Sequence, residues 1–348
     1  MVSAAQLLGM VRAKGAQAVF SLPAPVIRRL AGPPLVKDGR TLDPEMQLLL
    51  RIMGLQGPAV ESLPITRGRR MYTEAFTMLA GKQPIGAVTD RQIDGPAGPI
   101  DLRFYTPQGL SGTAPALVYL HGGGWVYGDL DAYDGVCRFL AEHAQVRVIS
   151  VDYRLAPEAV FPAGVEDAIA AWRWVTEHAT GLGIDPQRIA VGGDSAGGNL
   201  SAIIAQEAVR DDSLVAPAFQ LLIYPATDFT EEHPSRRANG EGFLLTRTFM
   251  DLVEENYLAG DEDRADPRLS PLRHHPAGVA PAYVVTAGFD PLLDEGTLYA
   301  EKLKEAGVPV EHVCEDGLIH GFANMIGIGR SAPAAMRRAA AALQRGLS

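Results

Sequence analysis

Short apolar segments alternate with amphipathic segments along most of this chain, and no other feature restricts its fold as strongly. Buried strands of a parallel sheet are nearly continuous apolar runs, and such runs cover residues 116–120, 146–151, 189–191, 219–224 and 282–286. Helical periodicity lies between them, at residues 131–143, 165–178, 198–209 and 295–306. A repeated strand-helix-strand order joins parallel strands through crossover helices. The sequence therefore predicts an α/β fold with a doubly wound, mostly parallel sheet.

Further strands are expected on both sides of this alternation. Residues 87–93 and 100–105 alternate in polarity and flank the turn-forming Asp94-Gly95-Pro96, which predicts an antiparallel pair. Residues 310–314 have the pattern of a last strand, and the Ala- and Arg-rich residues 332–343 have that of a closing helix. With these additions the expected sheet has eight strands.

Two regions do not follow the alternation. Residues 1–82 show helical and loop patterns, interrupted by Pro33-Pro34 and Gly57-Pro58. Residues from about 226 to 270 follow the fourth parallel strand and include an amphipathic helical pattern over 246–258. Open α/β sheets bind ligands at the carboxyl ends of their strands. We therefore expect both regions to cover that edge of the sheet.

The segment Gly193-Asp194-Ser195-Ala196-Gly197-Gly198 follows one predicted strand and opens the next helix. G-x-S-x-G in this context is a nucleophile turn, in which small flanking residues let the backbone approach closely while the serine hydroxyl stays exposed. Free N–H groups at the start of the helix favour negative charge that develops during attack. Ser195 is therefore the predicted nucleophile.

A glycine-rich loop, His121-Gly122-Gly123-Gly124-Trp125, comes directly after the strand at 116–120. A tetrahedral oxyanion needs N–H donors at about 2.7 to 3.1 Å, and successive glycines can turn their amides toward it. We assign Gly123 and Gly124, with Ala196, to this oxyanion hole and keep Gly122 as an alternative donor. A plain turn or a phosphate loop is the rival interpretation, but neither Gly-Lys-Ser/Thr nor G-x-G-x-x-G is present.

A serine nucleophile needs a general base, and in the nucleophile-turn fold an acid and then a histidine follow the serine. His320 lies in a Gly-flanked loop after the last strand, which favours it over the other downstream histidines, His233, His274, His275 and His312. Asp290 comes just after the strand at 282–286 and is the predicted orienting carboxylate. Asp294 is the alternative, although its place inside the following helix favours an N-terminal dipole role.

At these residues the chain resembles the bacterial hormone-sensitive-lipase-like carboxylesterases, also called family IV. The resemblance runs from about Pro84 to the C-terminus and rests on several motifs in order: the glycine loop, Asp152-Tyr153-Arg154-Leu155-Ala156-Pro157-Glu158 with Phe161-Pro162-Ala163, Gly193 to Gly198, Asp290 to Asp294, and His320-Gly321-Phe322. It implies an α/β-hydrolase fold in which residues 83–348 form the catalytic domain. Residues 1–82 and the insertion at about 226–270 would then form a helical cap.

The resemblance also implies hydrolysis of short- to medium-chain acyl esters by Ser195, His320 and Asp290, without a metal or an organic cofactor. It places Asp152 and Glu158 in a structural network near the site, and His121 as a brace for the glycine loop. The same residues could serve an amidase, a lactonase or a deacetylase, and a non-catalytic receptor is the rival from another class. As substrate-binding residues we name Trp125, Tyr127, Asp194 and Tyr224, although aromatic residues beside a sheet are as often core.

Charge and composition restrict the partners. The formal net charge of −10 disfavours nucleic acid and anionic lipid surfaces. Cys137 and Cys314 lie outside metal-ligand or redox spacings, so we expect free thiols and no metal site. The apolar stretch at residues 7–11 is interrupted by charged residues, and no apolar run approaches the roughly 18 to 20 residues that cross a bilayer. We therefore expect a cytoplasmic enzyme that acts on a small ester, and the sequence leaves a homodimer open.

Overall fold

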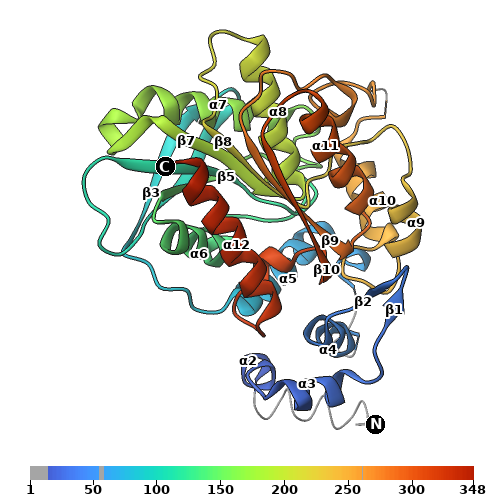
Figure 1. Ribbon diagram of the computed structural model, residues 1–348. Helices are drawn as coiled ribbons and strands as arrows, with labels where there is room; N and C mark the ends of the chain where they lie inside the picture. Colours follow the sequence, from blue (N-terminus) through green and yellow to red (C-terminus); the bar gives the residue numbers. More distant parts are fainter. Residues whose placement is uncertain (1–14, 55–58, 261) are drawn as a thin grey trace.

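The computed structural model of this chain describes residues 15–54, 59–260 and 262–348 and is built around an eight-stranded sheet (Figure 1). The strand order is β10-β9-β8-β7-β5-β6-β4-β3. The strands are β3 (Ala87–Gly95), β4 (Gly98–Thr106), β5 (Ala114–Leu120), β6 (Arg147–Asp152), β7 (Ile184–Asp194), β8 (Phe219–Ile223), β9 (Ala282–Phe289) and β10 (Val310–Ile319). Each of the eight predicted strands is present, which confirms the expected sheet.

The six strands from β5 to β10 are parallel to their neighbours, whereas β4 is antiparallel to β6 and β3 is antiparallel to β4. Burial follows this division. Every residue of β8 and β9 is buried, while β3 is mostly exposed. The continuous apolar runs in the sequence are thus strands covered on both faces, and the alternating ones lie at the antiparallel edge.

Helices pack on both faces of the sheet (Figure 1). One face carries α6 (Asp134–Ala144) and α12 (Ser331–Gly346), which also contact each other. The other face carries α7 (Ala163–His178), α8 (Ala196–Arg210) and α11 (Leu293–Glu305). All five lie where the sequence periodicity placed helices. Crossovers on both faces bring the carboxyl ends of the parallel strands to one edge, where β7, β9 and β10 end close to one another.

The elements of the N-terminal region are α2 (Ala16–Phe20), α3 (Ala24–Ala31), β1 (Val36–Lys37), β2 (Arg40–Thr41), α4 (Pro44–Met53), η1 (Val60–Ser62) and α5 (Ile65–Ala80). The helices α2, α3 and α4 lie beyond the end of β10 in Figure 1. The expectation of helices and loops omitted the hairpin of β1 and β2. Its two-residue turn, Asp38-Gly39, has φ of 49° and 75°, the left-handed conformation that this turn requires.

Between β8 and β9 the chain forms α9 (Pro234–Asn239), α10 (Arg247–Tyr257) and the short η3 (Pro271–Arg273). The helix α10 begins where its sequence indicates, because the Thr246 side chain accepts a hydrogen bond from Phe249 N and caps the first turn. A further short helical turn, η2 (Thr180–Leu182), precedes β7, and η4 (Phe322–Asn324) follows His320.

Within the described ranges, no helix is both long and apolar enough to span a membrane. The apolar stretch at residues 7–11 and the dipeptide Gly57-Pro58 lie outside those ranges.

Candidate active site

Ser195 occupies a sharp turn between β7 and α8. Its φ of 53° is unusual for a residue with a side chain, and it places Ser195 as the N-cap of α8. The turn fits only because its neighbours are small. A Cβ added to Gly193 would lie 2.2 Å from Leu120 O, and one added to Gly197 would lie 1.8 Å from the same oxygen. The two glycines therefore let the turn pack directly against the end of β5.

Three side chains far apart in the sequence meet at this turn. Ser195 Oγ lies 3.0 Å from His320 Nε2, and His320 Nδ1 lies 2.7 Å from Asp290 Oδ2. Asp290 follows β9 and is fully buried, and its other oxygen accepts a hydrogen bond from Leu292 N at 2.8 Å. Asp294, the alternative carboxylate, instead accepts from Ser235 N at 2.8 Å. This geometry allows proton transfer from the hydroxyl to an imidazole that a buried carboxylate orients.

The other downstream histidines have partners elsewhere. His233 Nε2 contacts Asp228, His274 Nε2 contacts Ala265 O, and His312 Nε2 contacts Thr286 Oγ1. Upstream, His121 Nδ1 contacts Gly122 O at 2.8 Å, and its ring stacks on Tyr153. Burial lowers the pKa of His121 to about 4, so its ring is neutral near pH 7. The neutral, buried ring of His121 is therefore in a position to brace the glycine loop.

The glycine loop lies beside Ser195, and its amides differ in their partners. Gly123 and Gly124 have φ of 110° and 63°. Their amides and that of Ala196 have no acceptor in the described part of the chain, so they are available to a ligand. The Gly122 amide instead donates to Asp194 Oδ1 at 2.9 Å. This structure therefore favours Gly123 and Gly124 over Gly122 as oxyanion donors, because the single Gly122 N–H is already used.

A cavity of about 630 Å³ opens onto Ser195 and His320. Its wall is mainly apolar and combines the N-terminal region with the segment between β8 and β9. The lining side chains include Leu50, Met53, Met71, Tyr72, Ala75, Phe76, Leu79, Phe243, Leu244, Leu245, Phe249, Met250 and Val253. A volume of this size is typical of small-molecule sites.

The four residues expected to bind substrate fall into two groups. Trp125 and Asp194 line the cavity, but Tyr127 and Tyr224 do not. Tyr127 is fully buried behind the wall, where its ring lies 5.7 Å from that of Tyr72 and 5.3 Å from that of Phe249. Tyr224 is also buried, with its ring 4.5 Å from that of His320. The substrate-binding role of these two tyrosines stays a prediction, and in this structure each one packs behind a residue that lines the cavity.

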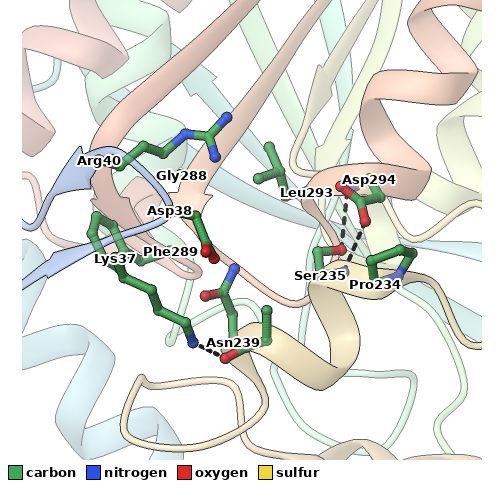
Figure 2. Close-up of a pocket in the computed structure, with 11 residues that line it drawn as sticks. Lys37, Asp38, Arg40, Pro234, Ser235, Asn239, Gly288, Phe289, Leu293 and Asp294 are labelled. Carbon is green, nitrogen blue, oxygen red and sulfur yellow. Dashed lines mark hydrogen bonds between the residues drawn. The ribbon is translucent and has the colours of Figure 1, made fainter.

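The loop that carries Asp290 is held by α9, a contact that the sequence did not indicate. Asn239 Nδ2 donates to Asp290 O at 3.2 Å, and Ser235 Oγ donates to Pro291 O at 2.7 Å. Figure 2 shows Ser235 bonded to Asp294 on one side of a small cavity of about 140 Å³. On its other side Lys37, from the β1–β2 hairpin, reaches the end of α9. Both the hairpin and α9 therefore buttress the Asp290 loop.

The two acidic residues of the Asp152–Glu158 segment behave differently. Glu158 forms an ion pair with Arg69, whose guanidinium also donates to Val126 O and Ala156 O. This arginine of α5 thereby ties the N-terminal region to the end of the glycine loop. Asp152 has no side-chain hydrogen bond within the described ranges, and burial raises its pKa to about 6.

One group of potential metal ligands occurs in the described part of the chain, formed by Asp228, Glu231 and His233. Their ligand atoms lie within 4.8 Å of one another, but the Arg273 guanidinium bonds both carboxylates. A cation already lies among these oxygens, so the group is a charge network that does not fit a metal ion.

Comparison with known proteins agrees with this geometry. Residues 117–324 match a protein-family model described as the alpha/beta hydrolase fold. The chain is 45% identical to the carboxylic ester hydrolase LipN of Mycobacterium tuberculosis, over 98% of this chain and 93% of that relative. It is 39% identical to an ethyl acetate hydrolase of Pseudomonas putida, over 88% of this chain and all of that relative.

Solved structures extend the similarity to three dimensions. An ester-hydrolase from the metagenome of Lake Arreo, solved with a derivative of bipyridine phosphonate, superposes with a TM-score of 0.84 at 42% identity. The match covers 87% of this chain and 98% of the Lake Arreo chain. A thermostable esterase from Pseudomonas putida superposes with a TM-score of 0.85 at 33% identity, over 90% of this chain and 99% of that one.

Proposed function

Because this chain belongs to the hormone-sensitive-lipase-like family of α/β-hydrolase carboxylesterases, and is a carboxylic ester hydrolase, we propose that it cleaves short- to medium-chain acyl esters through an acyl-enzyme on Ser195. The observation that carries this proposal is the hydrogen-bonded series from Ser195 Oγ to His320 at 3.0 Å and from His320 to Asp290 at 2.7 Å.

In the proposed first step, Ser195 Oγ attacks the ester carbonyl carbon while His320 Nε2 takes the hydroxyl proton. Asp290 accepts the bond from His320 Nδ1, which holds the tautomer and stabilises the imidazolium that forms. His320 then protonates the leaving alkoxide, and the alcohol departs. In the second step His320 activates a water, which attacks the acyl-enzyme and releases the acid.

In both steps the carbonyl oxygen becomes an oxyanion. We assign its donors to the amides of Gly123, Gly124 and Ala196. Ala196 is the first residue of α8, so the positive end of the helix macrodipole adds to this stabilisation. Removal of one such donor costs about 2.7 to 4 kcal/mol of barrier in comparable sites.

The cavity supports neutral, apolar acyl groups as substrates. Two of its charged lining residues are neutralised by ion pairs, since Arg236 pairs with Glu295 and Glu254 pairs with Arg264. The ethyl acetate hydrolase of Pseudomonas putida, by its name, acts on a small neutral ester, which is consistent with the lower end of this range.

A series of p-nitrophenyl esters from acetate to palmitate tests both the nucleophile and the chain length. We expect highest activity with short and medium chains, and loss of nearly all activity in Ser195→Ala, with circular dichroism to verify the fold. Full activity in a folded Ser195→Ala variant would refute the assignment of the nucleophile. Matched amide, lactone and acetylated substrates test the amidase, lactonase and deacetylase alternatives.

Three further points stay predictions. Residues 1–82 and about 226–270 are proposed to form the cap over residues 83–348 as the catalytic domain. The enzyme is proposed to lie in the cytoplasm, which fractionation tests. Sedimentation of the purified chain distinguishes the monomer from the homodimer.

A further inference from the structure

One buried carboxylate has no part in the reaction described above, yet it contacts the segments that carry it. Asp194 is the last residue of β7 and directly precedes Ser195, and its side chain is 2% exposed. Its two oxygens accept four hydrogen bonds, and none comes from a cationic group. An uncompensated buried charge is expensive to keep unless it is well hydrogen-bonded. The four hydrogen bonds therefore point to a role of the Asp194 carboxylate in holding neighbouring segments in place.

On one side Asp194 holds the glycine loop. Its Oδ1 accepts from Gly122 N at 2.9 Å and from Tyr119 OH, on β5, at 2.8 Å. The bond from Gly122 orients the backbone that continues into Gly123 and Gly124, whose amides are the proposed oxyanion donors. The approach is close, because a Cβ on Gly122 would lie 2.5 Å from Asp194 Oδ2.

On the other side Asp194 reaches the histidine loop through Tyr224. Its Oδ2 accepts from Tyr133 OH at 3.3 Å and from Tyr224 OH at 3.4 Å. The Tyr224 hydroxyl accepts in turn from Ala323 N at 3.2 Å, three residues after His320. The Tyr224 ring also lies 4.5 Å from the imidazole of His320. Asp194 and Tyr224 thus connect the serine turn with the segment that carries the base.

We propose that Asp194 is a positioning residue that fixes the glycine loop and the His320 loop relative to the Ser195 turn. This inference rests on the proposed serine mechanism. It assigns Asp194 a role through other residues, in place of the substrate contact that the sequence suggested.

The charge of Asp194 contributes to the strength of these bonds, because a hydrogen bond to an ionised acceptor is roughly twice as strong as a neutral one. Burial raises the pKa of Asp194 to about 6. The carboxylate therefore takes up a proton as the pH falls through about 6, and its hydrogen bond from the Gly122 amide weakens. The titratable groups that face it are Tyr72 from α5, Tyr119 from β5, Tyr133 and Cys137 at α6, Tyr153 after β6, Tyr224 after β8 and His320 after β10.

Two substitutions at Asp194 separate the acceptor from the charge. Asp194→Ala removes the acceptor for Gly122, and we expect kcat with p-nitrophenyl butyrate to fall on the order of 100-fold with KM nearly unchanged, as when an oxyanion donor is lost. Asp194→Asn keeps a neutral acceptor, and we expect it to restore most of this loss. If both variants fold and keep kcat within about twofold of the wild type, the proposal is wrong.

The pH profile provides a second test, which does not need the alanine variant to fold. In the wild type, protonation of Asp194 should cause a partial loss of kcat as the pH falls through about 6, because the carboxyl then becomes a neutral acceptor like the amide of Asp194→Asn. This loss should be absent in Asp194→Asn, so the ratio of wild-type kcat to variant kcat should fall toward 1 below about pH 6. An identical acid limb and identical kcat in the two proteins would overturn the proposal even if Asp194→Ala does not fold.

A tyrosine pair controls for the loss of a buried hydroxyl. Tyr224→Phe breaks the link to Asp194 and should lower kcat severalfold. Tyr299→Phe removes an equally buried hydroxyl, which is bonded to Gln206 near the C-terminal end of α8, and should leave kcat unchanged.

Labelling with a fluorophosphonate separates failure of this inference from failure of the serine mechanism. Absence of a covalent adduct on Ser195 in the wild type would contradict the mechanism itself. A normal adduct in the wild type, formed at the same rate in Asp194→Ala, would contradict only the positioning role.

Discussion

At Gly124 the glycine loop approaches α10, a helix that also lines the cavity. This residue has φ of 63°, and a Cβ built on it would lie 2.6 Å from Val253 Cγ2 on α10. Two separate costs therefore oppose a side chain there: a steric one from Val253, and a left-handed backbone that costs an L-residue roughly 1–2 kcal/mol. The two can be separated, because Val253 belongs to a different element and can be shortened independently.

We expect Gly124→Ala to lower kcat/KM for p-nitrophenyl butyrate at least tenfold, because the loop must move and the amide with it. Adding Val253→Ala should recover part of the loss by removing the clash, while the backbone cost remains. Val253→Ala alone is the control and should change kcat/KM little. Additive effects in this double-mutant cycle would show that the contact does not constrain the loop.

The residues proposed for catalysis could be found from the sequence because each occupies a position fixed by its motif and by a strand end. Ser195 follows one strand, Asp290 another and His320 the last, so the topology alone brings them to one edge. The partners of Asp194 could not be found in this way. Tyr119, Tyr133 and Tyr224 belong to three different segments, and nothing local indicates that their hydroxyls converge. The same limit applies to Gly122, because the sequence does not show that its amide is engaged by a tertiary contact.

Among the elements, α10 is joined to the N-terminal region through its N-cap residue, Thr246. Thr246 Oγ1 accepts from Phe249 N at 3.0 Å and donates to Glu61 Oε1, in η1, at 2.8 Å. Both Thr246 and Glu61 line the cavity, so one hydroxyl caps a helix and joins the two parts of the proposed cap.

Thr246→Val preserves the shape of this side chain but removes the hydroxyl, and loss of a cap of this kind costs about 1 kcal/mol. We expect the free energy of unfolding in urea to fall by about that amount, and KM for a medium-chain ester to rise because the cavity wall loses its cross-link. Thr246→Ser retains both bonds and should behave as the wild type. Equal stability of the valine and serine variants would contradict the capping role.

Element boundaries differ from the sequence prediction where tertiary pairing extends a strand. The apolar run at 189–191 predicted a short strand, whereas β7 begins at Ile184, because Ile184 pairs with Ala114 across an irregular register. The β1–β2 hairpin had a local signal in Asp38-Gly39, but its strands are too short to show alternation. Helices were placed more closely, since their periodicity and caps lie within the segment itself.

On the scale of the whole molecule, the N-terminal region is attached to the C-terminal part of the chain. Asp43 N donates to Gly317 O, just before His320, and the Asp43 side chain accepts from Ser331 Oγ. The buried Glu45 accepts from the amides of Arg330 and Ser331 at the start of α12. The α4 helix is therefore held against residues that precede and residues that follow the proposed base. These contacts cross the domain boundary that the sequence suggested at residue 82.

The apolar contacts lead to the same conclusion and can be measured. Met46 of α4 is fully buried, in a single core cluster that also includes Val285 of β9, Ile319 of β10 and Met336 of α12. If this cluster is one cooperative core, Met46→Ala should lower the free energy of unfolding of the whole chain by about 2–5 kcal/mol. Met78→Ala is the matched control, because Met78 is 48% exposed and surface changes usually stay within about 0.5 kcal/mol.

Both variants should be compared by urea unfolding, followed by circular dichroism and by ester hydrolysis. If the core is single, the circular dichroism and activity transitions of Met46→Ala shift together to a lower urea concentration. The reason is that α4 cannot separate without exposing the end of the sheet that carries the His320 loop. If activity is lost well before the sheet unfolds, residues 1–82 detach as a separate unit and the N-terminal region is a removable cover. Coincident shifts would instead mean that the N-terminal region contributes directly to the stability of the fold that carries the site.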